Sequence, residues 1–184
     1  MPRWSVAFVR IVDRMNYGVG RFAMYLLFVL MGILMWSTIS KVAFTPSYWT
    51  LEMAQFAMVA YYILGGPYSM QLASHVRMDL AYAKWSARKR AWVDAFTIFA
   101  LIVYLGVMLW GALDSLGYSL GLTWEGGVPQ IGRLERSPTA WRPYMWPIKG
   151  ILCVGFLLML LQSIAYFIRD IATLRGAPIP GGDI

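Results

Sequence analysis

The amino-acid sequence predicts an all-α integral membrane protein with four transmembrane helices. First, 59% of its 184 residues are hydrophobic, 16% are aromatic and only 14% are charged, whereas soluble domains carry about 25% charged residues. Second, four segments are long and apolar enough to cross a bilayer, which takes about 20 residues in a helix. They lie at about residues 22–44, 51–73, 92–113 and 147–168, and we expect them to form one membrane domain over residues 1–184.

The distribution of Lys and Arg predicts the orientation of these spans. The N-terminus, the loop between spans two and three and the C-terminus hold 11 of the 16 basic residues, and the connections on the other side hold five. Because cytoplasmic connections carry the excess of Lys and Arg, an even number of spans predicts that both termini are cytoplasmic. The net charge of +7 then indicates topology and attraction to anionic lipid, rather than nucleic-acid binding.

The first 20 residues predict an amphipathic helix on the membrane surface. Arg10, Asp13 and Arg14 interrupt any apolar core, so the segment does not read as a secretory signal peptide. Apolar side chains recur at helical spacing on one face, and basic ones gather on another. The apolar set is Trp4, Phe8, Ile11, Val12 and Met15, and the basic set is Arg3, Arg10 and Arg14. Such a helix suits the interface; the alternative is a loosely ordered basic leader.

Spans one and two are predicted to be antiparallel neighbours, because the turn between them at residues 45–49 is short. Span two contains Gly65, Gly66 and Pro67, and this combination is expected to kink or locally unwind the helix. Broken helices often mark substrate sites in transporters. No ionisable side chain accompanies this break, which favours a structural kink that fits a neighbouring helix.

The most strongly charged segment, residues 74–90, predicts a second interfacial helix between spans two and three. Its main basic stripe lies between two apolar flanks, which suits a helix among the phosphates of anionic phospholipids. The residues of this stripe are Arg77, Lys84 and Arg88. His75 and Asp79 are i,i+4 neighbours on the opposite side and can pair. The alternative is a solvated cytoplasmic loop that only fixes the orientation.

Residues 114–146 form one long external segment between spans three and four. Its glycines and prolines predict turns and short pieces rather than a separate folded domain. Loops of this kind tend to be binding surfaces, and large aromatic side chains argue against a disordered insertion. These aromatic residues are Trp124, Trp141, Tyr144 and Trp146. Span four then begins at Pro147, since proline is favoured at the first helical position.

The central parts of the four predicted spans contain no Asp, Glu, Lys, Arg or His. These parts are about residues 24–40, 56–73, 95–113 and 150–168. Because ion pathways through membranes are usually marked by such residues, we do not expect the chain alone to be an ion-coupled carrier. The remaining polar groups, such as Gln71, Thr97 and Gln162, are typical of interhelical hydrogen bonds.

The sequence lacks the residues that catalysis or cofactor binding would require. His75 is the only histidine and Cys153 the only cysteine, which excludes a bis-histidine haem site and a cysteine pair for disulfide exchange. The sequence has no phosphate loop and no HExxH motif. We therefore expect no catalytic residue, no metal and no cofactor, and a scaffold or partner subunit instead.

Two motifs resemble the small membrane subunit of tripartite ATP-independent periplasmic (TRAP) transporters, the DctQ-like family. The first has the form H-[IV]-R-x-D-[LV] and is followed by basic residues; it is present as His75, Val76, Arg77, Asp79 and Leu80, then Arg88 and Arg90. The second is an external E-x-S before proline, tryptophan and an apolar span, present as Glu135-Arg136-Ser137, Trp146-Pro147 and Gly155-Phe156-Leu157-Leu158. The resemblance covers about residues 20–170, with residues 116–134 as an insertion.

This resemblance implies a subunit of the bacterial inner membrane that braces a large multi-span permease subunit. The transport would be sodium-coupled uptake of an organic acid or similar solute, delivered by a periplasmic solute-binding protein. The motif match implies cytoplasmic anchoring by His75, Arg77 and Asp79, with Lys84, Arg88 and Arg90 at the same interface with the partner or with anionic phospholipid. The external candidates for ordering the loop are Glu135 and Ser137, with Trp141 and Trp146 beside them.

Two other functions remain open from the sequence. The same fold could serve as a structural accessory subunit of another membrane assembly, such as a respiratory or photosynthetic complex. A self-sufficient exporter of small molecules is a weaker hypothesis, because the middle of the spans carries no ionisable group.

Overall fold

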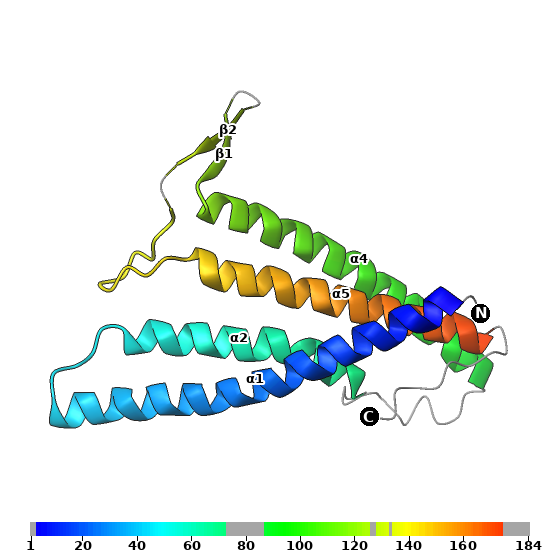
Figure 1. The fold of residues 1–184 in the computed structure, drawn as a ribbon, viewed down its shortest axis with the longest axis horizontal. Helices are drawn as coiled ribbons and strands as arrows, with labels where there is room; N and C mark the ends of the chain where they lie inside the picture. The colour runs from blue at the N-terminus through cyan, green and yellow to red at the C-terminus, as the bar shows by residue number, and fades with distance from the viewer. Residues whose placement is uncertain (1–2, 73–86, 126–127, 133, 175–184) are drawn as a thin grey trace.

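In the computed structural model, four long helices run side by side and a β-hairpin projects from one end (Figure 1). The structure describes residues 3–72, 87–125, 128–132 and 134–174. In chain order, its elements are α1 (Arg3–Ala43), α2 (Thr50–Gln71), α4 (Ala87–Ser119), β1 (Leu122–Glu125), β2 (Val128–Ile131) and α5 (Trp146–Leu174). Helix α1 begins at the same end of the bundle at which α5 ends.

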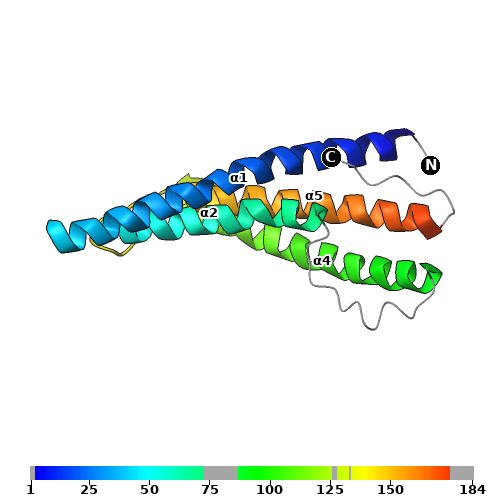
Figure 2. The same ribbon diagram turned by 90° about the horizontal axis from the view of Figure 1, so that it is seen from below.

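Helix α5 lies in the middle of the bundle. It packs against α4 and α2, and also against α1. At the end where α1 begins, α5 lies between α1 and α4 (Figure 2). Helices α1 and α2 form an antiparallel pair, as their short connection predicts. Ala165 and Ala172 of α5 are fully buried, because small side chains let the neighbouring helices approach this central helix closely.

Three helices in the described part of the chain are long and apolar enough to cross a bilayer. They are Trp4–Ala43, Trp92–Ser119 and Trp146–Ala172. Helix α2 is not among them: its 22 residues include Glu52, Gln55, two glycines, a proline and three tyrosines, which lower its hydropathy. The helical bundle is consistent with the predicted membrane class, and the crossing by α2 stays a prediction.

Helices α1, α4 and α5 extend well beyond the predicted spans, whereas α2 begins at Thr50 and ends at Gln71, close to the predicted 51–73. The predicted span at 22–44, up to Ala43, and the separate helix expected before it form one continuous helix of 41 residues, α1. At 1.5 Å per residue, α1 is about 60 Å long, twice the hydrocarbon thickness of about 30 Å. Hydropathy marks only the part of a helix that matches lipid, whereas helical hydrogen bonding continues through residues such as Arg10 and Arg14, which are good helix formers.

The first half of α1 packs on α5 through only part of the predicted apolar face: Phe8 and Val12 belong to the packed side. Val9 and Val12 are buried against Ala165 of α5. Trp4 and Ile11, which belong to the predicted face, are exposed instead. The helix is thus anchored to the bundle along one side, while its location on a membrane surface stays a prediction.

Helix α2 stays helical through Gly65, Gly66 and Pro67, so the predicted local unwinding is wrong, while the alternative, a kink, stays a prediction. The proline is fully buried, and the neighbouring glycine serves packing: a Cβ atom on Gly66 would lie 3.0 Å from the sulfur of Met159 on α5. Contacts with α5 therefore hold this part of α2 in helical form.

The predicted external segment contains a β-hairpin that sequence reasoning did not anticipate. Gly121, with a φ of +76°, ends α4 in the left-handed conformation that glycine adopts readily. Strands β1 and β2 then pair antiparallel, from Leu122 opposite Ile131 to Glu125 opposite Val128. The hairpin stands out from the helices (Figure 1).

Candidate functional site

Most of the predicted cytoplasmic site residues lie outside the described residues. These are His75, Arg77, Asp79 and Lys84. Arg88 and Arg90 lie in the first turn of α4, which begins at Ala87. The predicted interface with a partner or with phospholipid at residues 74–90 therefore stays a prediction, and the described sites are two polar clusters at opposite ends of the bundle.

The first, which we name the loop cluster, consists of Glu52, Glu135, Ser137 and Lys149. Its central contact is an ion pair of 2.5 Å between Lys149 Nζ of α5 and Glu135 Oε2. Lys149 also donates to the carbonyl oxygen of Ser115 on α4, at 3.3 Å. The ammonium group of Lys149 holds the pKa of the Glu135 carboxyl below its usual range, against a smaller opposing effect of burial. One lysine thus connects the loop, α4 and α5.

The hydroxyl group of Ser137 links the same loop to α2. It donates to Glu52 Oε1 at 3.2 Å, and the backbone amide of Ser137 donates to the carbonyl oxygen of Pro143 at 2.9 Å. Glu52 is buried, although it lies at the start of the apolar helix α2. The loop cluster therefore reaches three helices from one short segment.

A second pair of side chains, Arg136 and Tyr144, joins two parts of the segment between β2 and α5. Arg136 lies over the ring of Tyr144, 4.5 Å from its centroid, and donates to the Tyr144 hydroxyl at 2.5 Å. The two residues also form an isolated β-bridge. Trp141 and Trp146, the other external candidates, are exposed, and Trp146 is the first residue of α5. Of the external candidates, Glu135 and Ser137 therefore contact other segments of the chain, whereas both tryptophans lie at the surface.

The second cluster, which we name the helix-pair cluster, joins α1 to α5 and consists of Asp13, Asn16, Gln162 and Arg169. Arg169 forms an ion pair with Asp13. Gln162 donates to Asp13 Oδ1 at 3.2 Å and accepts from Asn16 Nδ2 at 2.5 Å. Asn16 and Gln162 are fully buried, and Asp13 is nearly so. Both ends of the Gln162 amide are occupied by α1, which fixes how α1 and α5 are aligned.

Sequence reasoning anticipated only one member of the helix-pair cluster. The predicted interhelical hydrogen bond of Gln162 is confirmed. The same prediction is wrong for Thr97, whose hydroxyl donates to the Val93 carbonyl of its own helix. The i,i+3 spacing of Asp13 and Asn16 places both on one helix face, and this was the available signal for a polar interface.

Among the described residues, no three His, Cys, Asp or Glu side chains lie close enough together to hold a metal ion. Within each cluster, most polar groups instead pair with one another, although the buried Asn16 Oδ1 and Glu52 Oε2 accept no hydrogen bond from the residues that the structure describes. These contacts hold the helices and the loop in fixed positions.

The fold and these clusters define a small helical membrane protein whose polar side chains tie its own segments together. The family described as tripartite ATP-independent periplasmic transporters, DctQ component, matches residues 30–173. This match covers well over half of the chain, so the chain belongs to that family, the small membrane component of TRAP transporters. Searches of curated proteins and of solved structures give no significant match. Membership implies association with a large permease subunit and a binding protein.

Proposed function

We propose that this chain is the scaffold subunit that braces the large permease subunit during sodium-coupled, binding-protein-dependent uptake of an organic acid or similar solute. The observation that carries the proposal is the distribution of polar groups. The two clusters lie at opposite ends of the bundle and tie its segments to one another, while the middle of each predicted span has no Asp, Glu, Lys, Arg or His. A transport route needs polar groups along its length, whereas a brace needs fixed helices and an apolar outer surface.

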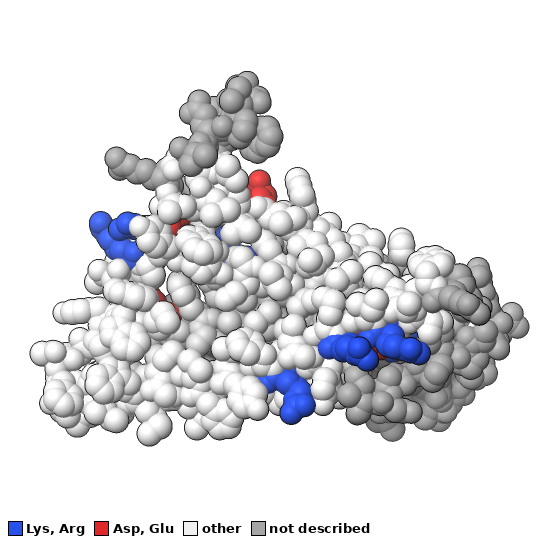
Figure 3. Space-filling view, viewed as in Figure 1, with Lys and Arg blue, Asp and Glu red and all other residues white. Residues whose placement is uncertain are grey.

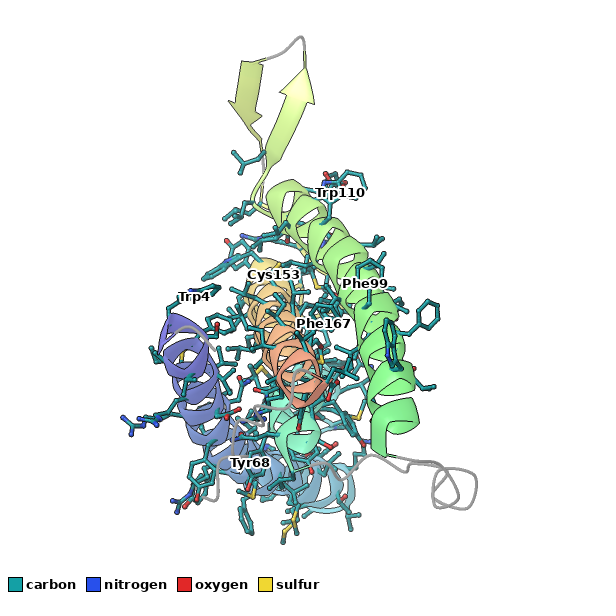
Figure 4. The ribbon with its side chains drawn as sticks, turned by 90° about the vertical axis from the view of Figure 1, so that its right-hand side faces the viewer. Trp4, Tyr68, Phe99, Trp110, Cys153 and Phe167 are labelled. Atoms are coloured by element: carbon teal, nitrogen blue, oxygen red, sulfur yellow. The ribbon has the colours of Figure 1, made fainter. Side chains whose placement is uncertain are left out.

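The outer surface of the bundle supports a large contact area within the membrane. The second half of α1 and much of α4 expose bulky apolar side chains. On α1 these include Phe28, Leu34 and Met35, and on α4 they include Phe96, Phe99, Val107 and Trp110. Figure 4 shows Phe99 and Trp110 projecting away from the other helices. In a bilayer, such surfaces are covered by lipid or by helices of a partner.

The proposed topology has four crossings, with both termini in the cytoplasm of a bacterial inner membrane. The excess of Lys and Arg at one end supports it, as does the packing of α2 antiparallel to α1 and parallel to α5 (Figure 1). A cysteine at Leu134, which is exposed, should react with an impermeant maleimide added to intact spheroplasts. The buried Cys153 serves as the internal control. Labelling of residue 134 only after membrane disruption would reverse the topology.

The association itself is tested by purifying the chain in mild detergent and identifying its partners by mass spectrometry. We expect a large multi-span permease. Arg77→Ala and Asp79→Ala should lower recovery of that permease more than they lower membrane insertion, because both positions belong to the motif at the proposed cytoplasmic anchor. Recovery within a respiratory or photosynthetic assembly would contradict the transport function, and unchanged permease recovery in both variants would contradict the anchor.

A further inference from the structure

A groove between α1 and α2 opens at the surface of the bundle. It encloses about 420 Å³ and lies at the end of α2 where the helix contains its paired glycines. The side chain of Tyr68 packs directly against Gly20 of α1, and this contact joins the two helices beside the groove. Figure 4 shows Tyr68 where α1 and α2 meet. The lining includes Gly20, Tyr61, Tyr62, Gly65, Gly66 and Tyr68.

Gly65 keeps this groove open. A Cβ atom at Gly65 would meet nothing within 4 Å, whereas one at the adjacent Gly66 would press on Met159 of α5. The absence of a side chain at Gly66 therefore lets α2 pack closely on Met159 of α5, whereas Gly65 makes no such contact. A Cβ atom at position 65 would point into space that the described residues leave open, on the wall of the groove.

A cation stands at the edge of the groove. Arg21 follows the lining residue Gly20 and is exposed. Its guanidinium group lies 5.7 Å from the ring centroid of Tyr17, and that ring meets Tyr68 edge to face at 5.9 Å. On the face shown in Figure 3, basic side chains lie over the first half of α1, and its second half is uncharged. Arg21 thus places a positive charge beside a groove whose lining is mostly apolar or aromatic.

We propose that this groove binds one anionic phospholipid, with its phosphate at Arg21 and one acyl chain along Gly65. Arginine pairs with phosphate through charge-assisted hydrogen bonds, and tyrosine rings are typical of the headgroup level of a membrane. The assignment concerns this chain alone and does not depend on what the complete transporter carries.

The length and the lining of the groove suit an acyl chain. From Tyr61 to the C-cap residue Leu72, the lining residues extend along about 16 Å of helix, at 1.5 Å per residue. The lining is mostly apolar or aromatic, so an extended hydrocarbon chain can lie along it.

The test is native mass spectrometry of the purified full-length chain, titrated with phosphatidylglycerol or with phosphatidylcholine of the same acyl chains. Gly65→Leu should lower the retained phosphatidylglycerol by about fivefold or more, because the new side chain occupies the groove. Gly32→Leu on α1 is the matched control, since a Cβ atom there also meets nothing within 4 Å; it should bind lipid as the wild type does. Arg21→Gln should remove the preference for phosphatidylglycerol and leave phosphatidylcholine binding unchanged.

Wild-type lipid retention by Gly65→Leu would overturn the site, provided that its thermal unfolding midpoint is no lower than that of the wild type. We expect that midpoint to hold, because leucine has the higher helix propensity. Wild-type lipid retention together with loss of the permease subunit would assign the groove to a partner helix and would also overturn the proposal. An unchanged preference for phosphatidylglycerol in Arg21→Gln would overturn the role of the arginine.

Discussion

The helix-pair cluster and the loop cluster use similar chemistry in different surroundings. Each contains one acid–base pair and joins segments far apart in the sequence. The other members are the amides Asn16 and Gln162 in the helix-pair cluster, and the hydroxyl of Ser137 with a second carboxylate, Glu52, in the loop cluster. In the helix-pair cluster, the side chains of Asp13 and Arg169 are 6% and 15% exposed. In the loop cluster, those of Glu135 and Lys149 are 30% and 17% exposed. The carboxylates differ most: one is enclosed by two helices, and the other lies near the surface on a loop.

This difference in burial predicts a difference in strength and in response to conditions. Removing one partner of a buried ion pair leaves the other charge without compensation, at a cost of about 3–5 kcal/mol. A more exposed pair contributes about 1 kcal/mol or less, and salt screens it. The helix-pair cluster should therefore determine whether α1 stays on α5, whereas the loop cluster should adjust the position of one loop.

The largest expected effect comes from Asp13→Ala. The substitution removes the Asp13 carboxylate from Arg169 and the acceptor Asp13 Oδ1 from the Gln162 amide nitrogen. We expect the free energy of unfolding in detergent to fall by about 3 kcal/mol. Arg14→Ala is the matched control, because Arg14 is the next residue of α1 and its side chain is exposed; it should change stability by less than about 0.5 kcal/mol. Equal effects of the two substitutions would contradict the assigned strength of the helix-pair cluster.

The next effect separates the amide contact from the ion pair. Asn16→Ala and Gln162→Ala should each cost about 1–2 kcal/mol, because each leaves a buried polar group of its partner unsatisfied. A double-mutant cycle should give a coupling energy of about 0.6 kcal/mol, the average for hydrogen bonds between membrane helices. Thr97→Ala, which removes an exposed hydrogen bond within α4, is the control. Strict additivity of the two substitutions would show that the contact does not stabilise the helix pair.

The helices could be predicted from the sequence better than the contacts between them. The apolar runs at about residues 92–113 and 147–168 lie within α4 and α5, because long apolar segments in a helix leave few alternatives in lipid. Hydropathy could not predict that residues 3–43 form one helix, since Arg10, Asp13 and Arg14 lower the apolar score without weakening helical hydrogen bonds.

Periodicity alone could not predict which polar side chains pair with one another. The spacing of Asp13 and Asn16 predicts that they share a helix face, but not that this face meets Gln162 and Arg169, about 150 residues further along the chain. Gly65 and Gly66 show the same limit. Both read as helix breakers, and only the tertiary contacts distinguish the glycine that packs on Met159 from the one that opens a groove.

The smallest expected effect lies in the loop cluster and depends on pH. Lys149 lowers the pKa of Glu135 in the folded state, so the ion pair contributes stability above the ordinary pKa of a glutamate. That contribution is lost as the pH falls through the lowered folded-state pKa. Glu135→Gln should therefore speed hydrogen exchange in residues 134–145 near pH 7, by an amount that corresponds to about 1 kcal/mol or less.

Two conditions make this last prediction specific to the ion pair. Relative to the wild type, the effect of Glu135→Gln should shrink in high salt, and it should vanish at a pH where Glu135 is protonated in the folded protein. Asp13→Ala provides the contrast, because its buried pair is screened much less by salt. If both substitutions respond equally to salt, burial does not distinguish the two clusters, and the division between a fixed helix pair and an adjustable loop fails.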